Sequence, residues 1–171
     1  MKEESNINFW QKVAFLYGPF MKNSHKLYEN ICRRIKPDLN RNMDVLELAC
    51  GSGQLSFALA QCVRHWEATD FSEKMIEEAK KKEHSSRLFF SVQDATALPY
   101  APASFDVVVI ANALHIMPYP EKALAEISRV LKPGGILYAP TFVQIEGKMP
   151  KFRMRMMEGI GFHTYHKWNA G

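Results

Sequence analysis

Apolar residues along this chain alternate between the spacing of a strand and the spacing of a helix. Short, nearly continuous apolar runs predict strands, whereas apolar residues three or four positions apart predict one face of an amphipathic helix. The run Phe105–Ile110 reads FDVVVI, which is typical of a central parallel strand buried on both faces. Runs of this kind predict strands at Val45–Ala49, Leu88–Val92, Phe105–Ile110 and Ile136–Ala139, and the strand-like stretch His65–Asp70 predicts another.

Predicted helices fill the intervals between these strands. The first repeats apolar residues at Leu27, Ile31 and Ile35 and stops at Pro37, which cannot continue a helix. Three more are expected: Gln54–Val63, a helix capped by Ser72 that runs through Met75, Ile76 and Ala79, and one with Leu124, Ile127 and Leu131 that ends at Lys132–Gly135. This alternation predicts one α/β domain over residues 1–171, with a doubly wound, mostly parallel, Rossmann-like sheet.

The first predicted strand leads into the stretch that carries most of the chemistry, MDVLELACGSGQL at residues 43–55. Its glycines allow a ligand to approach the backbone closely, and the helix that follows offers unpaired N–H groups. The second strand ends at Asp70 and the third is followed by Gln93 and Asp94, which places two carboxylates at the same edge of a parallel sheet. Each aspartate alone would be read as a cap or turn residue, but together with the glycine loop they predict a ligand that contains a nucleoside.

Composition narrows the class of protein. The chain has 171 residues, of which 47% are hydrophobic, so one domain with a sizeable core is expected. Three cysteines without framework spacing predict reduced thiols, and no stretch has the pattern of a signal peptide or of a membrane helix. We therefore expect a cytoplasmic protein without a membrane partner. A net charge of +4 is too small to predict binding to nucleic acid.

Histidine and cysteine spacings do not predict a metal site. His163 and His166 lie three apart in an expected strand and would point to opposite faces of it. Cys62 and His65 lack further ligands at the spacing of a zinc site. No metal is therefore expected.

Four stretches in sequential order give the chain its resemblance to a known family. They are VLELACGSG (45–53), ATDFSEKMIEEAK (68–80), VQDATALPYAPASFDVVVIANALHIM (92–117) and EISRVLKPGGIL (126–137). With them the chain resembles the class I S-adenosylmethionine-dependent methyltransferases, in particular the UbiE-like type that acts on small molecules. The resemblance covers roughly residues 9–142. It implies a helical lid over residues 1–40, a cofactor-binding core at 41–142 and a C-terminal helix and strand at 143–171.

The resemblance also implies a role for individual residues. Asp70 would bind the ribose hydroxyls, Phe71 would pack on the adenine, and Asp94 with the Ala95 N–H would meet the adenine edge. His115 would lie near the transferred methyl group as the residue that could act as a general base, although a packing histidine is an equal alternative. Leu114 would also lie near the transferred methyl group. The remaining residues would line the methionine part or cover the cofactor: Glu47, Ala49, Gly51, Gly53, Ala111, Asn112 and the lid residue Tyr17.

Two features need separate discussion: the cysteine in the glycine loop and the C-terminal segment. Cys50 in the glycine loop has no neighbouring base and is expected to be structural. The family sheet has seven strands, whereas the chain ends at Gly171 after an expected helix at Phe152–Glu158 and a sixth strand at Phe162–Trp168. We therefore expect the seventh strand to be missing and the fifth strand to have an unpaired edge. The C-terminal segment would pair with the fifth strand, dock on another subunit or be partly disordered.

Three functions remain after these observations. The first is methyl transfer to a small-molecule acceptor by in-line displacement, and the second is cofactor binding without catalysis. The third, an NAD-dependent oxidoreductase, is disfavoured because Ser56 stands where a third glycine or alanine belongs. The motif ANALH at 111–115 differs from that of amino-methylating DNA enzymes, which disfavours a DNA base as the acceptor. The sequence leaves open whether the protein forms a homodimer.

Overall fold

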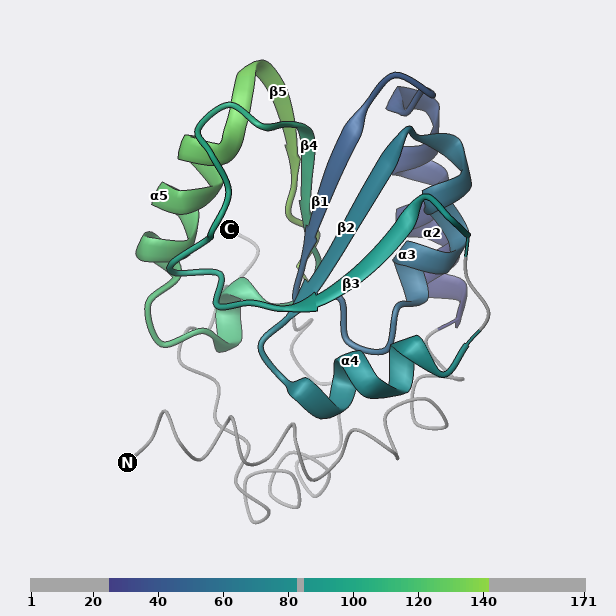
Figure 1. Ribbon diagram of the computed structural model, residues 1–171, viewed down its shortest axis with the longest axis horizontal. Coiled ribbons are helices and arrows are strands. Elements are labelled where there is room, and N and C mark those ends of the chain that lie inside the picture. The colour runs from purple at the N-terminus through teal and green to yellow at the C-terminus, as the bar shows by residue number, and fades with distance from the viewer. Residues whose placement is uncertain (1–24, 83–84, 142–171) are drawn as a thin grey trace, which may run out of the picture.

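Five parallel strands form one sheet in the computed structural model, which describes residues 25–82 and 85–141 (Figure 1). The strands are β1 (Asp44–Leu48), β2 (His65–Asp70), β3 (Leu88–Val92), β4 (Phe105–Ile110) and β5 (Leu131–Tyr138). Their spatial order is β3-β2-β1-β4-β5, and each neighbouring pair is parallel. The predicted doubly wound, Rossmann-like sheet is therefore confirmed.

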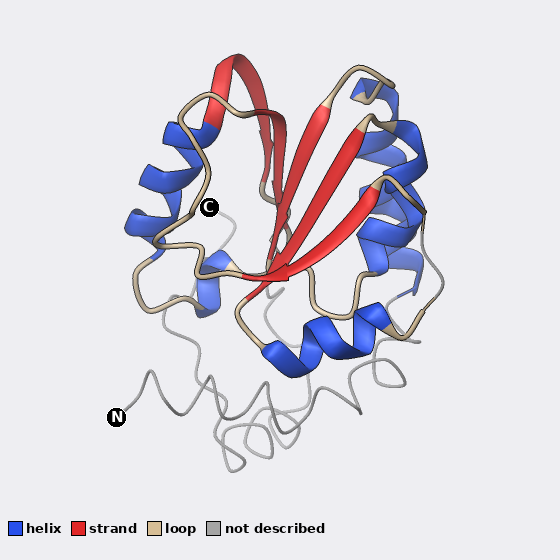
Figure 2. Ribbon diagram, viewed as in Figure 1, coloured by secondary structure: helices blue, strands red, loops and turns tan. Residues whose placement is uncertain are grey.

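Helices cover both faces of this sheet (Figure 2). One face packs against α2 (His25–Ile35), α3 (Gln54–Leu59) and α4 (Glu73–Lys80), and the other against α5 (Pro120–Val130). Short 3-10 turns follow at Lys36–Asp38, Ala60–Cys62 and Leu114–Ile116. The predicted cap of α4 is present, since the Ser72 hydroxyl accepts a hydrogen bond from the Met75 N–H.

The central strands supply apolar side chains to two separate cores. In β1, Val45 belongs to the core on the α2–α4 side, whereas Leu46 and Leu48 belong to the core under α5. Side chains alternate between the faces of a strand, and a strand buried on both sides therefore needs an almost unbroken apolar run. The FDVVVI run has this arrangement, with Val107 and Val109 on one side and Val108 and Ile110 on the other.

The end of α5 and the start of β5 differ from the sequence-based expectation. We expected the helix to continue to Lys132–Gly135 and the strand to span Ile136–Ala139. Instead α5 ends at Val130 and β5 begins at Leu131, which pairs with Phe105. Pro133 disfavours helical backbone at the preceding residue. The residues between Leu131 and Ile136 then form an irregularity in the strand, with Gly134 at φ +77°.

Two other boundaries also moved. β1 spans Asp44–Leu48 rather than Val45–Ala49, and α3 ends at Leu59 where a helix to Val63 was expected. The last residues of that expected helix form the tighter 3-10 turn Ala60–Cys62. Tyr17, most of the expected lid, the helix Phe152–Glu158 and the strand Phe162–Trp168 lie outside the described residues. The expectations about them remain predictions.

Candidate functional site at the carboxyl edge of the sheet

Most of the predicted site residues lie at the carboxyl ends of four strands or in the loops that follow them. From β1 the chain proceeds to β2 on one side, and β4 is followed by β5 on the other side, so the strand order reverses between β1 and β4. Ligands of open α/β sheets bind in the crevice beyond the strand ends at such a reversal. Leu48 and Ile110 are register partners there, and the loops that begin at Ala49 and Ala111 flank this point.

The glycine loop after β1 alternates in backbone conformation. Ala49, Gly51 and Gly53 have φ values of 55°, 56° and 87°, all in the left-handed region. Hydrogen bonds hold the loop in this form: the Cys50 N–H donates to Thr69 O at 2.9 Å, and the Gly53 N–H donates to Cys50 O at 3.0 Å. A Cβ on Gly53 would lie 2.6 Å from Cε2 of Phe57, so the loop lies too close to α3 for a side chain there.

Asp70 connects this loop to the next helix. Its Oδ2 accepts a hydrogen bond from the Gly51 N–H and its Oδ1 accepts one from the Ser72 N–H, each at 2.8 Å. Burial raises the pKa of this carboxyl group, although both backbone hydrogen bonds act in the opposite direction. A carboxylate has about four acceptor positions, so each oxygen keeps capacity for a further donor. A pair of ribose hydroxyls has the two donors that would fill this remaining acceptor capacity.

Glu47 lies in a buried polar cluster on the face of β1 that packs against α2, α3 and α4. Its Oε2 accepts hydrogen bonds from the Ser56 hydroxyl at 2.5 Å and from the Trp66 indole N–H at 2.9 Å. All three residues are almost completely buried. Burial raises the pKa of Glu47 to about 7, and the negative charge of Asp70 contributes to this rise. Sequence reasoning missed this cluster, since Ser56 was noted only as a departure from a dinucleotide motif.

Asp94 is the second residue of the loop between β3 and β4. Its Oδ1 accepts hydrogen bonds from both the backbone N–H and the hydroxyl of Thr96, each at 2.8 Å. The Ala97 N–H donates to the Asp94 carbonyl at 3.1 Å, which closes a turn over Ala95. The Gln93 N–H donates to Asp70 O at 3.1 Å, so the ends of β2 and β3 are joined directly. Phe71, expected beside the adenine, is 47% exposed.

The loop after β4 places its residues in different environments. Asn112 has a left-handed φ of 56°, and its N–H donates to Pro140 O at 2.8 Å. Leu114 is buried in the core under α5 together with Ile127, so its side chain packs into the core. Nδ1 of His115 is buried and makes no hydrogen bond within residues 25–82 and 85–141. Burial lowers the pKa of His115, which favours the neutral imidazole.

Two other features of the structure bear on the chemistry. Burial raises the pKa of the Cys50 thiol well above its ordinary value, which makes this residue a poor nucleophile. Among the described residues, no cluster of three or more His, Cys, Asp or Glu side chains is arranged to hold a metal ion.

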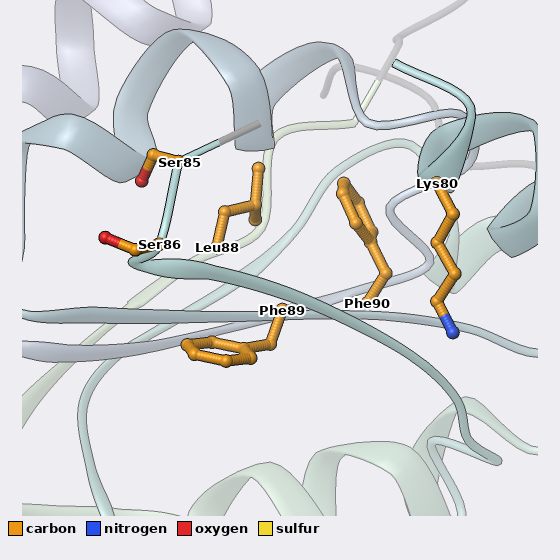
Figure 3. Close-up of a pocket in the computed structure, with 6 residues that line it drawn as sticks. All are labelled: Lys80, Ser85, Ser86, Leu88, Phe89 and Phe90. Atoms are coloured by element: carbon orange, nitrogen blue, oxygen red, sulfur yellow. The ribbon is translucent and has the colours of Figure 1, made fainter. Parts of the chain in front are cut away.

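A cavity of about 710 Å³ lies elsewhere, along β3 (Figure 3). Leu88 and Phe90 point to one side of this strand and Phe89 to the other, with Lys80 of α4 nearby. The residues that line the cavity are Lys80, Ser85, Ser86, Leu88, Phe89 and Phe90. None of them is a predicted site residue, and this cavity lacks the paired carboxylates found at the carboxyl edge.

Comparison with known proteins identifies the family. Residues 46–139 match the family described as the methyltransferase domain, and the matched segment runs from β1 through the end of β5. The chain belongs to the methyltransferase-domain family. The resemblance to class I S-adenosylmethionine-dependent methyltransferases is thereby confirmed, and the cofactor of this family is S-adenosylmethionine.

Individual relatives of this methyltransferase-domain chain agree with the assignment. A demethylmenaquinone methyltransferase from Leptospira interrogans is 38% identical over 139 residues, which are 74% of this chain and 56% of that protein. The ubiquinone/menaquinone biosynthesis C-methyltransferase UbiE from Rickettsia peacockii is 35% identical over 139 residues, 75% of this chain and 55% of that protein. The chain thus spans about half the length of these curated relatives.

A solved structure shows the same fold. The methyltransferase in a complex with the Trm112 activator from Haloferax volcanii superposes with a TM-score of 0.78 and 24% identity. The match covers 94% of this chain and 70% of that one.

Within the described residues, no helix is both long and apolar enough to cross a membrane.

Proposed function

We propose that this chain binds S-adenosylmethionine at the carboxyl edge of its sheet and transfers the methyl group to a small acceptor of the quinol type. The observation that carries the proposal is the position of Asp70, fixed by the N–H groups of Gly51 and Ser72 beside the glycine loop. The acceptor class is taken from the curated relatives, which are named as demethylmenaquinone and ubiquinone/menaquinone methyltransferases.

The nucleoside end of the cofactor is assigned to the edge formed by β2 and β3. Asp70 would accept hydrogen bonds from the ribose hydroxyls through the capacity that its two backbone donors leave unused. Asp94 would accept from the adenine amino group, and the Ala95 N–H would donate to a ring nitrogen. Phe71 supports this assignment because its exposed ring is available to pack on a base.

The methionine end is assigned to the loops after β1 and β4. Ala49, Gly51 and Gly53 on one side and Ala111 with Asn112 on the other would approach it through their backbones. Leu114 would support this wall from the core, since its own side chain is buried there. Tyr17 would cover the cofactor as part of the lid.

Glu47 would act on the cofactor through its charge. Its carboxylate hydrogen-bonds to Ser56 and Trp66 and forms no salt bridge with a cationic side chain in residues 25–82 and 85–141. A positively charged ligand beside the glycine loop would therefore stabilise the ionised form of this carboxylate.

The cofactor would supply a methyl group on a sulfonium whose leaving group is a neutral thioether. The protein then needs mainly to align the acceptor and exclude water. His115 would accept a proton from an acidic position of the acceptor, because burial lowers its pKa and so favours the neutral imidazole, and its Nδ1 has no partner in the described chain. The homodimer and the cytoplasmic location stay predictions.

A transfer assay tests this function directly. The chain is incubated with methyl-labelled S-adenosylmethionine and a reduced naphthoquinone that lacks a ring methyl group, and both products are followed by mass spectrometry. The expected result is equal formation of S-adenosylhomocysteine and methylated quinol, absent in Asp70→Ala. Cofactor binding without any transfer, to this or to simpler phenols, would support the alternative of a cofactor-binding protein without catalysis.

A further inference from the structure

Arg129 in the last turn of α5 binds the β3–β4 loop through a dense set of contacts. Its Nε donates to Glu126 Oε1 at 2.8 Å and its Nη2 to Glu126 Oε2 at 2.7 Å, so the two side chains form a two-pronged ion pair. The same guanidinium donates to the backbone carbonyls of Leu98 at 2.9 Å and Tyr100 at 2.7 Å. A helix side chain thus holds two residues of a loop about 30 positions away in the sequence.

Glu126 completes the attachment from the other direction. Its Oε2 accepts the Leu98 N–H at 2.7 Å, so both backbone groups of Leu98 are bound to the same ion pair. Leu98 itself is buried in the core under α5. The loop backbone is therefore fixed four residues after Asp94, and the turn between Asp94 and Ala97 bridges most of that interval.

We propose that Glu126 and Arg129 are positioning residues for the adenine end of the cofactor site, acting through the backbone at Leu98. This inference rests on the proposed function, which assigns the adenine edge to Asp94 and Ala95. The ion pair fixes the position of the loop relative to α5. The hydrogen bond from the Gln93 N–H to Asp70 O fixes the start of the loop beside β2. Asp94 and Asp70 then face one ligand from neighbouring strand ends.

The substitution Arg129→Lys separates the effect of the ion pair's geometry from the effect of its charge. Lysine keeps the positive charge but cannot reproduce a planar fork that binds a carboxylate and two carbonyls together. Backbone bonds from the Ala103 and Ser104 N–H groups to the carbonyls of Arg129 and Val130 remain in such a variant and keep the loop end attached to α5. Arg129→Lys should therefore fold while its loop near Leu98 is less well fixed.

The chain offers a matched control at the opposite edge of the sheet. Arg64 forms the same kind of two-pronged ion pair with Asp44, the first residue of β1, far from the strand ends that carry the site. Arg64→Lys removes a similar fork without touching the β3–β4 loop. Thermal unfolding of both variants is measured alongside binding, so that general loss of stability is separated from loss of positioning.

Calorimetric titration with S-adenosylhomocysteine provides the test. We expect Arg129→Lys to weaken binding about tenfold and Arg64→Lys to leave it within about twofold of the wild type. Arg129→Lys combined with Asp94→Asn should weaken binding by less than the product of the single effects, because both act on the same contact. Glu126→Gln provides a second variant with the same expected direction if Arg129→Lys fails to fold.

The outcomes distinguish this inference from the function on which it rests. If the wild type does not bind S-adenosylhomocysteine, the proposed function fails and this inference fails with it. If the wild type binds but Arg129→Lys and Glu126→Gln bind as tightly, only the positioning role is overturned. The positioning role would also be overturned if Arg129→Lys and Arg64→Lys lost affinity for S-adenosylhomocysteine equally and in proportion to the decrease in their melting temperatures.

Discussion

The carboxylate of Asp70 at the end of β2 accepts the Gly51 N–H of the loop after β1 at 2.8 Å. This bond joins two chain segments that are neighbours in the sheet but 19 residues apart in sequence. It orients the glycine loop and the carboxylate with respect to each other before any ligand arrives. Preorganisation of this kind reduces the entropy that ligand binding must overcome.

Alanine at two glycine positions tests how closely the loop packs on α3. Gly53→Ala places a Cβ 2.6 Å from the Phe57 ring at φ +87°, so we expect a loss of about 2 kcal/mol in the free energy of unfolding. Gly134→Ala has a similar φ of +77° but no atom within 4 Å, so strain alone should cost about 1 kcal/mol. Chemical denaturation measures both, and an equal cost in the two variants would contradict the steric argument.

The substitution Glu47→Gln tests whether the folded structure raises the pKa of this buried carboxyl group. The pKa of Glu47 is raised from 4.5 to about 7 in the folded chain, so the folded state holds its proton more tightly than the unfolded state. Stability then falls as the pH rises from 4.5 to 7, by about 3 kcal/mol from this group. Glu47→Gln removes that loss, and the variant should become more stable relative to the wild type as the pH increases.

Urea denaturation at several pH values measures this difference. The comparison with the wild type cancels the titrating groups that do not interact with Glu47, but not Asp70, whose negative charge acts on Glu47 and whose own pKa is raised by burial. A difference between Glu47→Gln and the wild type that stays constant from pH 4.5 to 8 would show that folding does not raise the pKa of Glu47, contrary to this prediction.

Replacement of His115 separates catalysis from binding. We expect His115→Gln to lower kcat for the quinol by about a hundredfold or more and to leave the affinity for S-adenosylhomocysteine unchanged. Burial lowers the pKa of His115 from 6.5, so the wild-type rate should fall only as the pH decreases through a value below 6.5. An acidic limb that persists in His115→Gln would assign it to another group.

Sequence patterns predicted most of this fold because the buried strands need continuous apolar runs. Phe105–Ile110 was placed correctly to the residue, and the Ser72 cap was also predicted correctly. The start of β5 was not, because Lys132–Gly135 has the composition of a helix-ending turn and its pairing with β4 is a long-range contact. Local sequence does not report which distant strand accepts such a segment.

The candidate site was predicted less completely than the fold. The topology places Asp70 and Asp94 at the ends of neighbouring strands, as the sequence order predicted. The cluster of Glu47, Ser56 and Trp66 was missed because its members come from three elements and have no common spacing. The buried side chain of Leu114 was likewise hidden, since a loop position does not reveal whether a residue turns toward the core.

The central claim is tested most directly by calorimetric titration of the chain with S-adenosylhomocysteine, compared with NAD and with two variants. Asp70→Asn should weaken binding of S-adenosylhomocysteine tenfold or more, because the ribose hydroxyls lose a charged acceptor. Asp106→Asn is the matched control: its carboxylate accepts the Asp44 N–H at 2.8 Å at the amino edge of the sheet, and its affinity should equal that of the wild type. Binding of NAD instead, or equal affinities in wild type and Asp70→Asn, would contradict the assignment of the site.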